Sequence, residues 1–370
     1  KSGIYNFSGN YKFDGNGNVQ SDPYGVPSLR IDSKVIDVLT AVNLEKGKQY
    51  KLDVQLSIAP FMWANLVEPS ATLYWAEATS RDYHKEALDA AKKGDVIIFC
   101  GGISPRLEGE EMKLETTGFA HGDRTDLELP KVQEDLLKEL LKTGKPIVYV
   151  NFSGSAIALN WENENLPAIV QAFYPGEAAG TALTRLLFGD FNPSGRLPIT
   201  FYKSVNDLPD FQNYVMEGRT YRYFKGEALF AFGYGLSYTN FKYKILQTPA
   251  SIATNGDSKV SVEVTNTGNR DGDEIVQLYI SNKEATVPVP IRTLAGFKSV
   301  FLKAGETKKV EFILTPQNFS IIDKDYNRIV QSGTFQISVG GQQPDIKAIE
   351  VQKVVQAEMK VNGSAFAIKE

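Results

Sequence analysis

The chain has 370 residues, enough for two or three domains at roughly 100–200 residues per domain. Hydrophobic residues make up 42% and charged residues 23% of it, a composition that excludes a disordered chain. The net charge of −4 comes from dispersed charges of both signs, without the basic patch that would indicate a nucleic-acid partner. No apolar run reaches the roughly 18 residues that span a membrane, and the N-terminus lacks the apolar core of a signal peptide.

Residues 1–76 are predicted to be β-rich. SLRIDSKVIDVL and KQYKLDVQLSI alternate apolar and polar side chains, as half-buried strands do. The segment 45–48 supplies a turn, with a glycine available for positive φ. The first strand, GIYNFSG, begins almost at residue 1 without a preceding partner, and we expect that the sequence is a piece of a longer protein.

Residues 77–240 change to an alternation of helices and strands. A helix is expected over 81–93, followed by DVIIFC, an apolar run that predicts a fully buried strand. Pro130 is expected at the first position of the next helix. The remaining predicted elements are strands at 146–152 and 168–175 and helices at 156–161 and 176–188. This order predicts an α/β sandwich with a mostly parallel sheet, in which functional groups collect at the carboxyl ends of strands.

The last third of the chain has a different pattern. Residues 201–240 are aromatic and irregular, and we expect them to wrap the α/β unit as a packed extended segment. From 241 to 370, short alternating strands such as KVSVEVTNTG and GTFQISVGG are separated by Asn/Gly turns, which indicates a β-sandwich of the fibronectin type III kind. The predicted fold class is therefore multi-domain, α/β plus all-β.

The stretch GGISPRLEGEEM, residues 101–112, places three carboxylates on a loop that follows a predicted core strand. Three explanations stay open for Glu108, Glu110 and Glu111. They form a solvated surface loop, which composition alone favours. Alternatively, crowding of like charges raises one pKa and produces a general acid. Metal binding is the third explanation, although EGEE does not have the spacing of an EF-hand.

Other reactive side chains have simpler explanations. Cys100 is the single cysteine, so an intrachain disulfide and a thiolate metal site are excluded, and its strand position predicts a buried, inert thiol. HGDRTD, residues 121–126, is more typical of a helix cap with a salt-bridge network than of a catalytic cluster. Ser153 and Ser155 fit a tight strand–helix turn with serine caps better than a nucleophile, since no G-x-S-x-G motif is present.

Several long segments carry a family resemblance. YPGEAAGTALTRLLFGDFNPSGRLPIT and FGYGLSYTNF, in this order, resemble the C-terminal half of glycoside hydrolase family 3, with its β-xylosidase-like branch the most similar. GDEIVQLYISN and SGTFQISVGG resemble the fibronectin-III-like domain of that family. Residues 1–76 resemble the second part of the protective-antigen-type β-sandwich that some members carry as an insert.

The resemblance implies a retaining exo-β-glycosidase, in which two carboxylates act on one glycosidic bond. The family's nucleophile is an aspartate on an N-terminal TIM-type barrel, for which this sequence has no room. The acid/base is a glutamate on a loop that reads E-x-E-x-M-D or G-E-G-Y-D. Laid on this sequence, the pattern assigns the role to Glu110. The family's next acidic residue is Lys113 here, so Glu111 and Glu108 are the alternatives.

These observations predict three parts: an insert at 1–76, an α/β domain at 77–240 and a fibronectin-III-like domain at 241–370. The implied substrate is an oligosaccharide with a terminal β-linked xylose or glucose. The implied partners are the TIM-type barrel of the same enzyme and a homodimer mate, with no metal or cofactor, and the location is secreted or periplasmic. Two other functions stay open: a non-catalytic carbohydrate-binding protein, and a serine hydrolase that uses Ser153 or Ser155.

Overall fold

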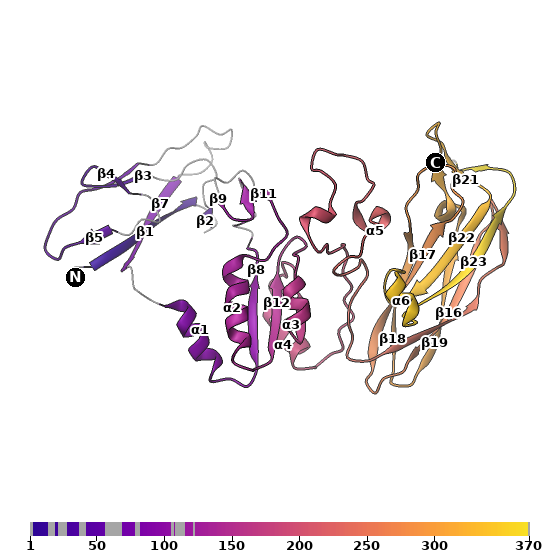
Figure 1. Cartoon of the computed structure of the whole chain (residues 1–370), viewed down its shortest axis with the longest axis horizontal. Helices are drawn as coiled ribbons and strands as arrows, with labels where there is room; N and C mark the ends of the chain where they lie inside the picture. Colours follow the sequence, from indigo (N-terminus) through magenta and orange to yellow (C-terminus); the bar gives the residue numbers. More distant parts are fainter. Residues whose placement is uncertain are drawn as a thin grey trace. The chain divides into compact units, whose positions relative to one another are not determined.

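The protein was analysed as a computed structural model (Figure 1). It forms two compact units, the first made of residues 1–126, 130–150 and 166–170 and the second of 127–129, 151–165 and 171–370. The residues that the structure describes are 3–13, 19–20, 28–36, 42–55, 69–77, 82–104, 107, 115–120 and 123–368.

The N-terminal region forms two small antiparallel sheets, which confirms the predicted β-rich character. One sheet is organised around β1 (Gly3–Phe13), which pairs with β7 (Pro69–Glu77), β5 (Val42–Leu44) and β2 (Val19–Gln20). The other has the order β4–β3–β6, with bounds Lys34–Ile36, Ser28–Ile31 and Leu52–Gln55. Asp32 and Ser33 join β3 to β4 with φ values of 48° and 69°, as a two-residue hairpin turn of matching twist requires.

The α/β region alternates helices and strands in the predicted order (Figure 1). Its elements are α1 (Tyr83–Ala91), β8 (Ile97–Gly102), α2 (Lys131–Leu141), β12 (Ile147–Phe152), α3 (Asn160–Asn165), β13 (Ala168–Gln171) and α4 (Ala179–Leu187). The sheet order is β13–β12–β8. A hydrogen bond from Ile97 to Pro146 joins the starts of β8 and β12, and one from Ala172 to Asn151 joins the ends of β13 and β12. The strands therefore run parallel, as predicted.

The prediction that DVIIFC is fully buried is wrong. Ile97 and Phe99 of β8 are half-buried, but Ile98 is 49% exposed and the Cys100 thiol is exposed rather than buried. The physical reason is that α2 packs against one face of β8, the face of Phe99 and Gly101. The alternate face, which carries Ile98 and Cys100, is exposed. β12 lies between two strands and is buried on both faces.

Two helix starts differ from the predicted ones. Pro130 is the N-cap of α2, one residue before the first helical position, and it makes no side-chain capping bond. The helix predicted at 156–161 lies at Asn160–Asn165 instead. Ile157, Ala158 and Leu159 are buried in extended backbone, and Ala158 forms an isolated β-bridge with Glu128. Tertiary packing thus outweighs the local helix preference of these residues.

Residues 201–240 form an irregular aromatic segment, as predicted, while their wrapping of the α/β unit stays a prediction. Its regular elements are the short helices η2 (Val205–Asp207) and α5 (Thr220–Tyr223). Tyr221 stacks on Phe232 with 4.1 Å between ring centroids, and Phe232 meets the edge of Tyr279. Contacts between aromatic rings provide the apolar packing that the regularly spaced side chains of a helix or strand would otherwise provide.

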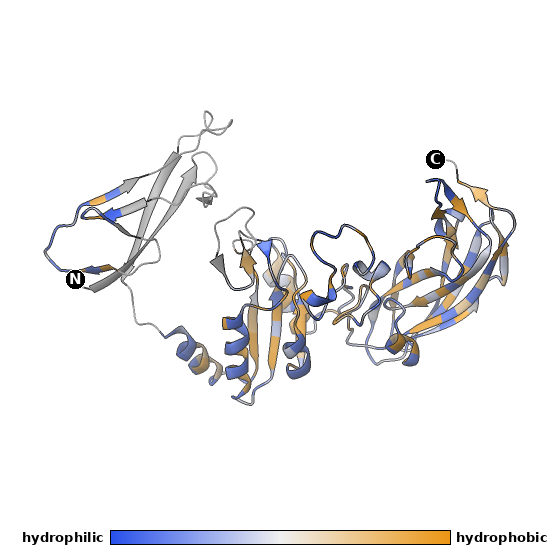
Figure 2. Cartoon of the chain, turned by 45° about the horizontal axis from the view of Figure 1, so that its top comes forward, coloured by the Kyte–Doolittle hydropathy of each residue, from blue (hydrophilic) through white to orange (hydrophobic). Residues whose placement is uncertain are grey.

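The C-terminal region is a β-sandwich of two main sheets, in the orders β14–β16–β19 and β15–β23–β22–β17–β18, with a third, small sheet in the order β20–β21–β24. Hydrophilic and hydrophobic residues alternate along its strands in Figure 2. This is the alternation from which the sequence predicted a β-sandwich. The bounds are β14 Phe241–Gln247, β15 Ser251–Ala253, β16 Ser258–Asn266, β17 Gly272–Asn282, β18 Thr293–Leu302, β19 Thr307–Leu314, η3 Pro316–Phe319, β20 Ile321–Ile322, β21 Arg328–Val330, β22 Gly333–Gly340, α6 Ile346–Glu350, β23 Val354–Asn362 and β24 Phe366–Ala367.

The core of the sandwich consists of aliphatic side chains from the facing sheets. Val262 and Val264 of β16 pack with Val276 and Leu278 of β17 and with Ile337 of β22, and all five are fully buried. Burying one such side chain stabilises the fold by about 1.5–3 kcal/mol.

Leu278→Ala should lower the free energy of unfolding by about 2–5 kcal/mol, because it removes a fully buried side chain and leaves a cavity. Leu236→Ala, the same change at an exposed position, should alter it by no more than about 0.5 kcal/mol. Urea unfolding followed by circular dichroism measures both. Equal losses in the two variants would contradict the assignment of this core.

Candidate functional site

The three candidate glutamates, Glu108, Glu110 and Glu111, lie outside the described residues, as does His121. The structure does describe the backbone on both sides of that loop. Ile103 follows β8 and is buried, and the N–H of Leu107 donates to the carbonyl of Ser104 at 2.9 Å. The geometry of these flanking residues defines where the loop leaves the sheet and where it returns.

The loop begins at a clamped glycine pair. The N–H of Gly102 donates to Oε1 of Gln133 on α2 at 2.8 Å, and Nε2 of Gln133 donates back to the carbonyl of Gly102 at 2.7 Å. Gly102 has φ of 122°, which side chains rarely tolerate. A Cβ at Gly101 would lie 2.5 Å from Oε1 of Gln133. Both glycines are therefore required for the side-chain amide to hold the end of β8.

The loop returns through a small antiparallel sheet of the order β11–β10–β9, with bounds Asp123–Arg124, Phe119–Ala120 and Glu115–Thr116. Gly118 turns the β9–β10 hairpin at φ of 86°, and its carbonyl accepts the N–H of Thr125 at 2.9 Å. Asp126 lies against Gly118 rather than capping α2, whose N-cap is Pro130. The helix cap predicted from residues 121–126 is therefore wrong, because strand pairing uses this segment.

Ser153 is a structural residue at the carboxyl end of β12. Its side chain is fully buried, and its Oγ donates to the carbonyl of Ser155 at 2.8 Å. The same Oγ accepts from the side-chain amides of Asn151 at 3.1 Å and Gln171 at 3.2 Å. The hydroxyl proton of Ser153 is donated to a carbonyl, and its lone pairs accept hydrogen bonds from two amides. A hydroxyl bonded in this way cannot act as a base-activated nucleophile. The geometry supports the strand–turn explanation and argues against a serine hydrolase.

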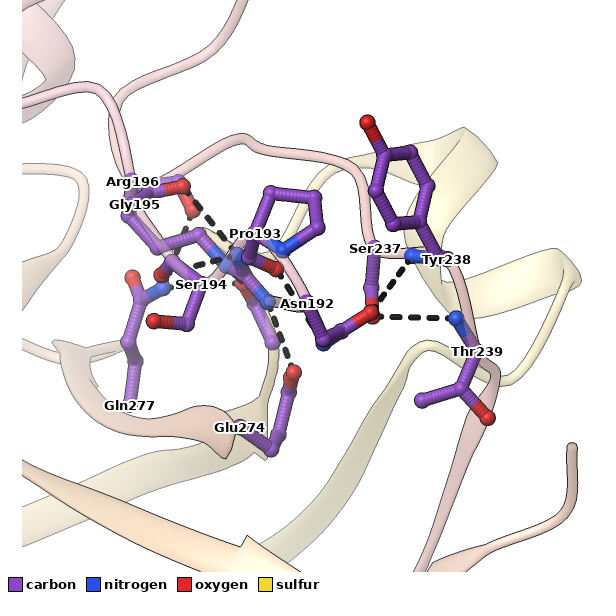
Figure 3. Close-up of polar contacts among 12 residues, drawn as sticks. Asn192, Pro193, Ser194, Gly195, Arg196, Ser237, Tyr238, Thr239, Glu274 and Gln277 are labelled. Carbon is purple, nitrogen blue, oxygen red and sulfur yellow. Dashed lines mark hydrogen bonds and ion pairs between the residues drawn. The ribbon is translucent and has the colours of Figure 1, made fainter. Parts of the chain in front are cut away.

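A buried ion pair that was not predicted from the sequence lies in the second unit (Figure 3). Nη2 of Arg196 is 2.6 Å from Oε2 of Glu274 on β17, and the two side chains are 9% and 3% exposed. The second carboxylate oxygen accepts a hydrogen bond from the hydroxyl of Tyr243 on β14. Nε of Arg196 donates to the carbonyl of Gly341 at 3.1 Å, so the guanidinium contacts two segments distant in sequence, at Glu274 and at Gly341.

Burial dominates the protonation chemistry of this pair. It raises the pKa of Glu274 above 4.5, and the opposing effects of Arg196 and Tyr243 only partly offset it. Burial, together with the adjacent carboxylate, also raises the pKa of Tyr243 well above 10. A charged carboxylate in this position therefore depends on its arginine.

The surrounding motif packs so closely that glycine is required. A Cβ at Gly235 would lie 2.3 Å from the carbonyl of Gly195. Oδ1 of Asn192 accepts the N–H of Tyr238 at 2.8 Å and the hydroxyl of Ser237 at 3.1 Å, which joins the two motif segments (Figure 3). NPSGR and FGYGLSYT are thus one packed element, although 35 or more residues separate them in sequence.

A sequence signal for the pair did exist. Glu274 occupies the same strand face as Val276 and Leu278, so a charge stands at an inward position of an alternating strand. Such a position requires a buried cation, and Arg196 lies within a Gly/Pro-rich motif.

No group of three or more His, Cys, Asp or Glu side chains within the described ranges is placed to hold a metal ion. None of the helices in the described part of the chain has both the length and the apolar composition that crossing a membrane requires.

Comparison with known families gives two matches. The sequence model of the glycosyl hydrolase family 3 C-terminal domain matches residues 7–238. That of the fibronectin type III-like domain matches residues 274–343. Both matches agree with the resemblance inferred from the motifs.

The chain is similar to a xylan 1,4-beta-xylosidase of Xylanibacter ruminicola, with 43% identity over 81% of this chain and 34% of that protein. It is 34% identical to a periplasmic beta-glucosidase of Salmonella typhimurium, over 69% of this chain and 34% of that protein. The crystal structure of a beta-glucosidase from Kluyveromyces marxianus covers 99% of this chain and superposes with a TM-score of 0.74 at 26% identity. The chain spans about a third of the length of these two curated relatives.

Arg196→Ala should lower the free energy of unfolding at pH 7 by about 3–5 kcal/mol, because it leaves the carboxylate of Glu274 buried without its cation. A carboxyl whose folded pKa is raised stabilises the fold below its unfolded value of 4.5, and this stability is lost as pH rises through the folded value. The deficit of the variant should therefore shrink at pH 4, as urea unfolding at the two pH values would show.

The matched control is Glu274→Gln in the Arg196→Ala background. It removes the titrating group, so the unfolding free energy relative to Arg196→Ala should rise at pH 7 and change little at pH 4. A deficit of Arg196→Ala that is the same at both pH values would contradict the role of Glu274.

Proposed function

The chain belongs to glycosyl hydrolase family 3, and from this premise we propose that it supplies the acid/base half of a retaining exo-β-glycosidase. The observation that carries the proposal is the family match over residues 7–238, which includes the glutamate loop. The position of that loop after β8 supports it, because functional groups of parallel sheets collect at the carboxyl ends of strands.

In the proposed mechanism, Glu110 protonates the leaving glycosidic oxygen and later deprotonates the water that attacks the glycosyl-enzyme. The nucleophilic aspartate would come from a TIM-type barrel domain of the same enzyme. The two hydrogen bonds between Gly102 and Gln133 support this role, since they fix the position of the residue from which the acid/base loop starts. Glu111 and Glu108 are the alternative acids.

The proposed substrate is an oligosaccharide with a terminal β-linked xylose or glucose. The relatives include a xylosidase and a glucosidase, and the chain matches the same share of each, 34%. They support both sugars and do not favour one over the other. A secreted or periplasmic location is proposed with the periplasmic relative as its support. A homodimer and the division into parts at 1–76, 77–240 and 241–370 stay predictions.

Glu110→Ala, made in the enzyme that includes the barrel, should lower turnover of nitrophenyl β-xyloside or β-glucoside at least about 100-fold, the usual contribution of a positioned general acid or base. Azide should restore part of the rate as a glycosyl azide forms, because a small anion can attack the glycosyl-enzyme without a general base. Initial rates with and without azide measure both effects.

Glu111→Ala is the matched control and should keep most of the activity. Loss and azide rescue in Glu111→Ala instead would move the assignment by one residue. The 370-residue chain alone should not turn over either nitrophenyl glycoside, since it holds only one of the two carboxylates. Robust turnover by the chain alone would overturn the proposed division of the active site.

A further inference from the structure

Residues 209–219 form a closed surface loop between η2 and α5. Gly218 closes the loop with φ of 76°, and a Cβ at Gly218 would lie 3.1 Å from Cγ of Pro209 at the other end. This length and these close ends are those of an Ω-loop, a compact surface loop that often carries function. Figure 1 shows the loop as an arch that ends at α5.

Arg219 fixes the inside of the loop. Its Nη2 donates to the carbonyl of Asn213 at 2.6 Å and to that of Asp210 at 3.1 Å, and its Nε donates to the carbonyl of Val215 at 3.3 Å. The backbone N–H of Arg219 adds a hydrogen bond to the carbonyl of Met216 at 3.0 Å. A charged group therefore occupies the centre of the loop and holds its backbone in a defined conformation.

The outside of the loop is apolar. Phe211 is 92% exposed and Tyr214 is 91% exposed, the two highest values for large apolar side chains in the described part of the chain. Val215 and Met216 are also exposed. Single exposed apolar residues are common, but four within six positions of one ordered loop indicate an interaction surface.

The fixed conformation of the loop favours binding. A flexible loop loses conformational entropy when a partner orders it, and this loss weakens the complex. The hydrogen bonds of Arg219 order the backbone in advance, and the N–H of Gln212 adds another to Oδ1 of Asp210 at 2.8 Å. Phe211 and Tyr214 are therefore presented to a partner with little further loss of backbone entropy.

The composition of this surface fits a protein better than a carbohydrate. Aromatic residues and methionine are enriched in the cores of protein interfaces, and charged residues are depleted there. The charge that follows the apolar side chains, Glu217, is paired with Lys225 at 2.9 Å. A sugar requires polar groups that are available beside the rings, whereas Oδ1 of Asn213 already accepts the N–H of Val215 at 3.0 Å.

The small size of the surface favours a domain of the same polypeptide over a separate chain. Stable complexes between separate chains use roughly 20–30 residues of each partner, far more than this loop offers. A tethered domain needs less contact, because the tether keeps its local concentration high. The chain covers 34% of two curated relatives and 44% of the Kluyveromyces marxianus beta-glucosidase, so more than half of each lies outside the matched part.

We propose that residues 209–219 dock into an apolar pocket of the TIM-type barrel domain of the same enzyme, with Phe211 and Tyr214 as the central side chains. This inference rests on the proposed function, which supplies the barrel. The loop contains none of the three candidate glutamates, so docking and proton transfer use different residues.

Hydroxyl-radical footprinting read by mass spectrometry tests the contact. Phe211 and Tyr214 should be oxidised at least about tenfold more slowly in the enzyme that includes the barrel than in the 370-residue chain, because the central side chains of an interface are fully desolvated. Tyr326, 90% exposed in the turn after β20, is the control and should be oxidised equally in both. Equal oxidation of Tyr214 in both would overturn the proposal.

The same measurement separates the barrel from a second copy of the chain. The oxidation rate of Tyr214 in the 370-residue chain should not depend on chain concentration, since no barrel is present. Protection that increases with the concentration of the chain would assign the loop to contacts between copies and would overturn the barrel as its partner.

Variants identify the loop as the contact. Phe211→Ser, Tyr214→Ser should lower the melting temperature of the enzyme with the barrel by at least about 2 °C more than that of the 370-residue chain, where both rings are exposed. The matched control is Phe297→Ser, Tyr326→Ser, the same change at exposed positions of the sandwich, which should shift both melting temperatures equally. Equal shifts for the loop variant as well would overturn the docking.

The outcome for docking is distinguishable from the outcome for the proposed function. Footprinting reads the burial of Phe211 and Tyr214 and does not depend on turnover. Protected rings in an enzyme that stays fully active as Glu110→Ala would support the docking while the acid/base assignment fails. Unprotected rings in an enzyme that Glu110→Ala inactivates and azide rescues would overturn the docking alone.

Discussion

The ion pair between Arg196 and Glu274 is the constraint on which the second unit depends. Two charges leave water almost completely, so each must find hydrogen bonds that replace its hydration. Tyr243 from β14 and the carbonyl of Gly341 after β22 provide them. A single side chain from the segment after α4 is thereby joined to both sheets of the sandwich. The energetic demand of burial makes the joint specific, because a misplaced segment would leave a bare charge inside.

The motifs that reveal the family are explained by this packing rather than by catalysis. NPSGR supplies the arginine, and FGYGLSYT supplies glycines that let its backbone approach closely. Gln277 on β17 completes the arrangement, since its amide donates to the carbonyls of Gly233 and Gly341 at 2.9 and 2.8 Å. A family can thus be recognised by residues that join its parts.

Periodicity predicted most of the elements, because it reports burial directly. It failed at β8, where an apolar run does not reveal whether a second layer covers the strand, and Ile98 and Cys100 proved exposed. It also failed at residues 156–161, where burial in extended backbone competes with helix formation. The Arg196–Glu274 pair joins residues 78 positions apart, a separation beyond any local pattern.

The candidate site was predictable only through resemblance. Composition places Glu108, Glu110 and Glu111 on one loop but gives no physical reason to prefer one of them, because all three are carboxylates in the same sequence environment. Ser153 shows the opposite case. The sequence favoured a structural turn over a nucleophile at this position, and the amides of Asn151 and Gln171 that donate to its hydroxyl are visible only in three dimensions.

The clamp between Gln133 and Gly102 has a consequence for an acid/base that gains and loses a proton in every cycle. The hydrogen bonds of a carboxylate or ammonium in place of the Gln133 amide would change in strength whenever the local electric field changed. The side-chain amide of Gln133 carries no charge and does not titrate, and it binds the backbone through one donor and one acceptor. The position of the residue from which the loop starts therefore does not depend on whether the proposed acid/base is protonated.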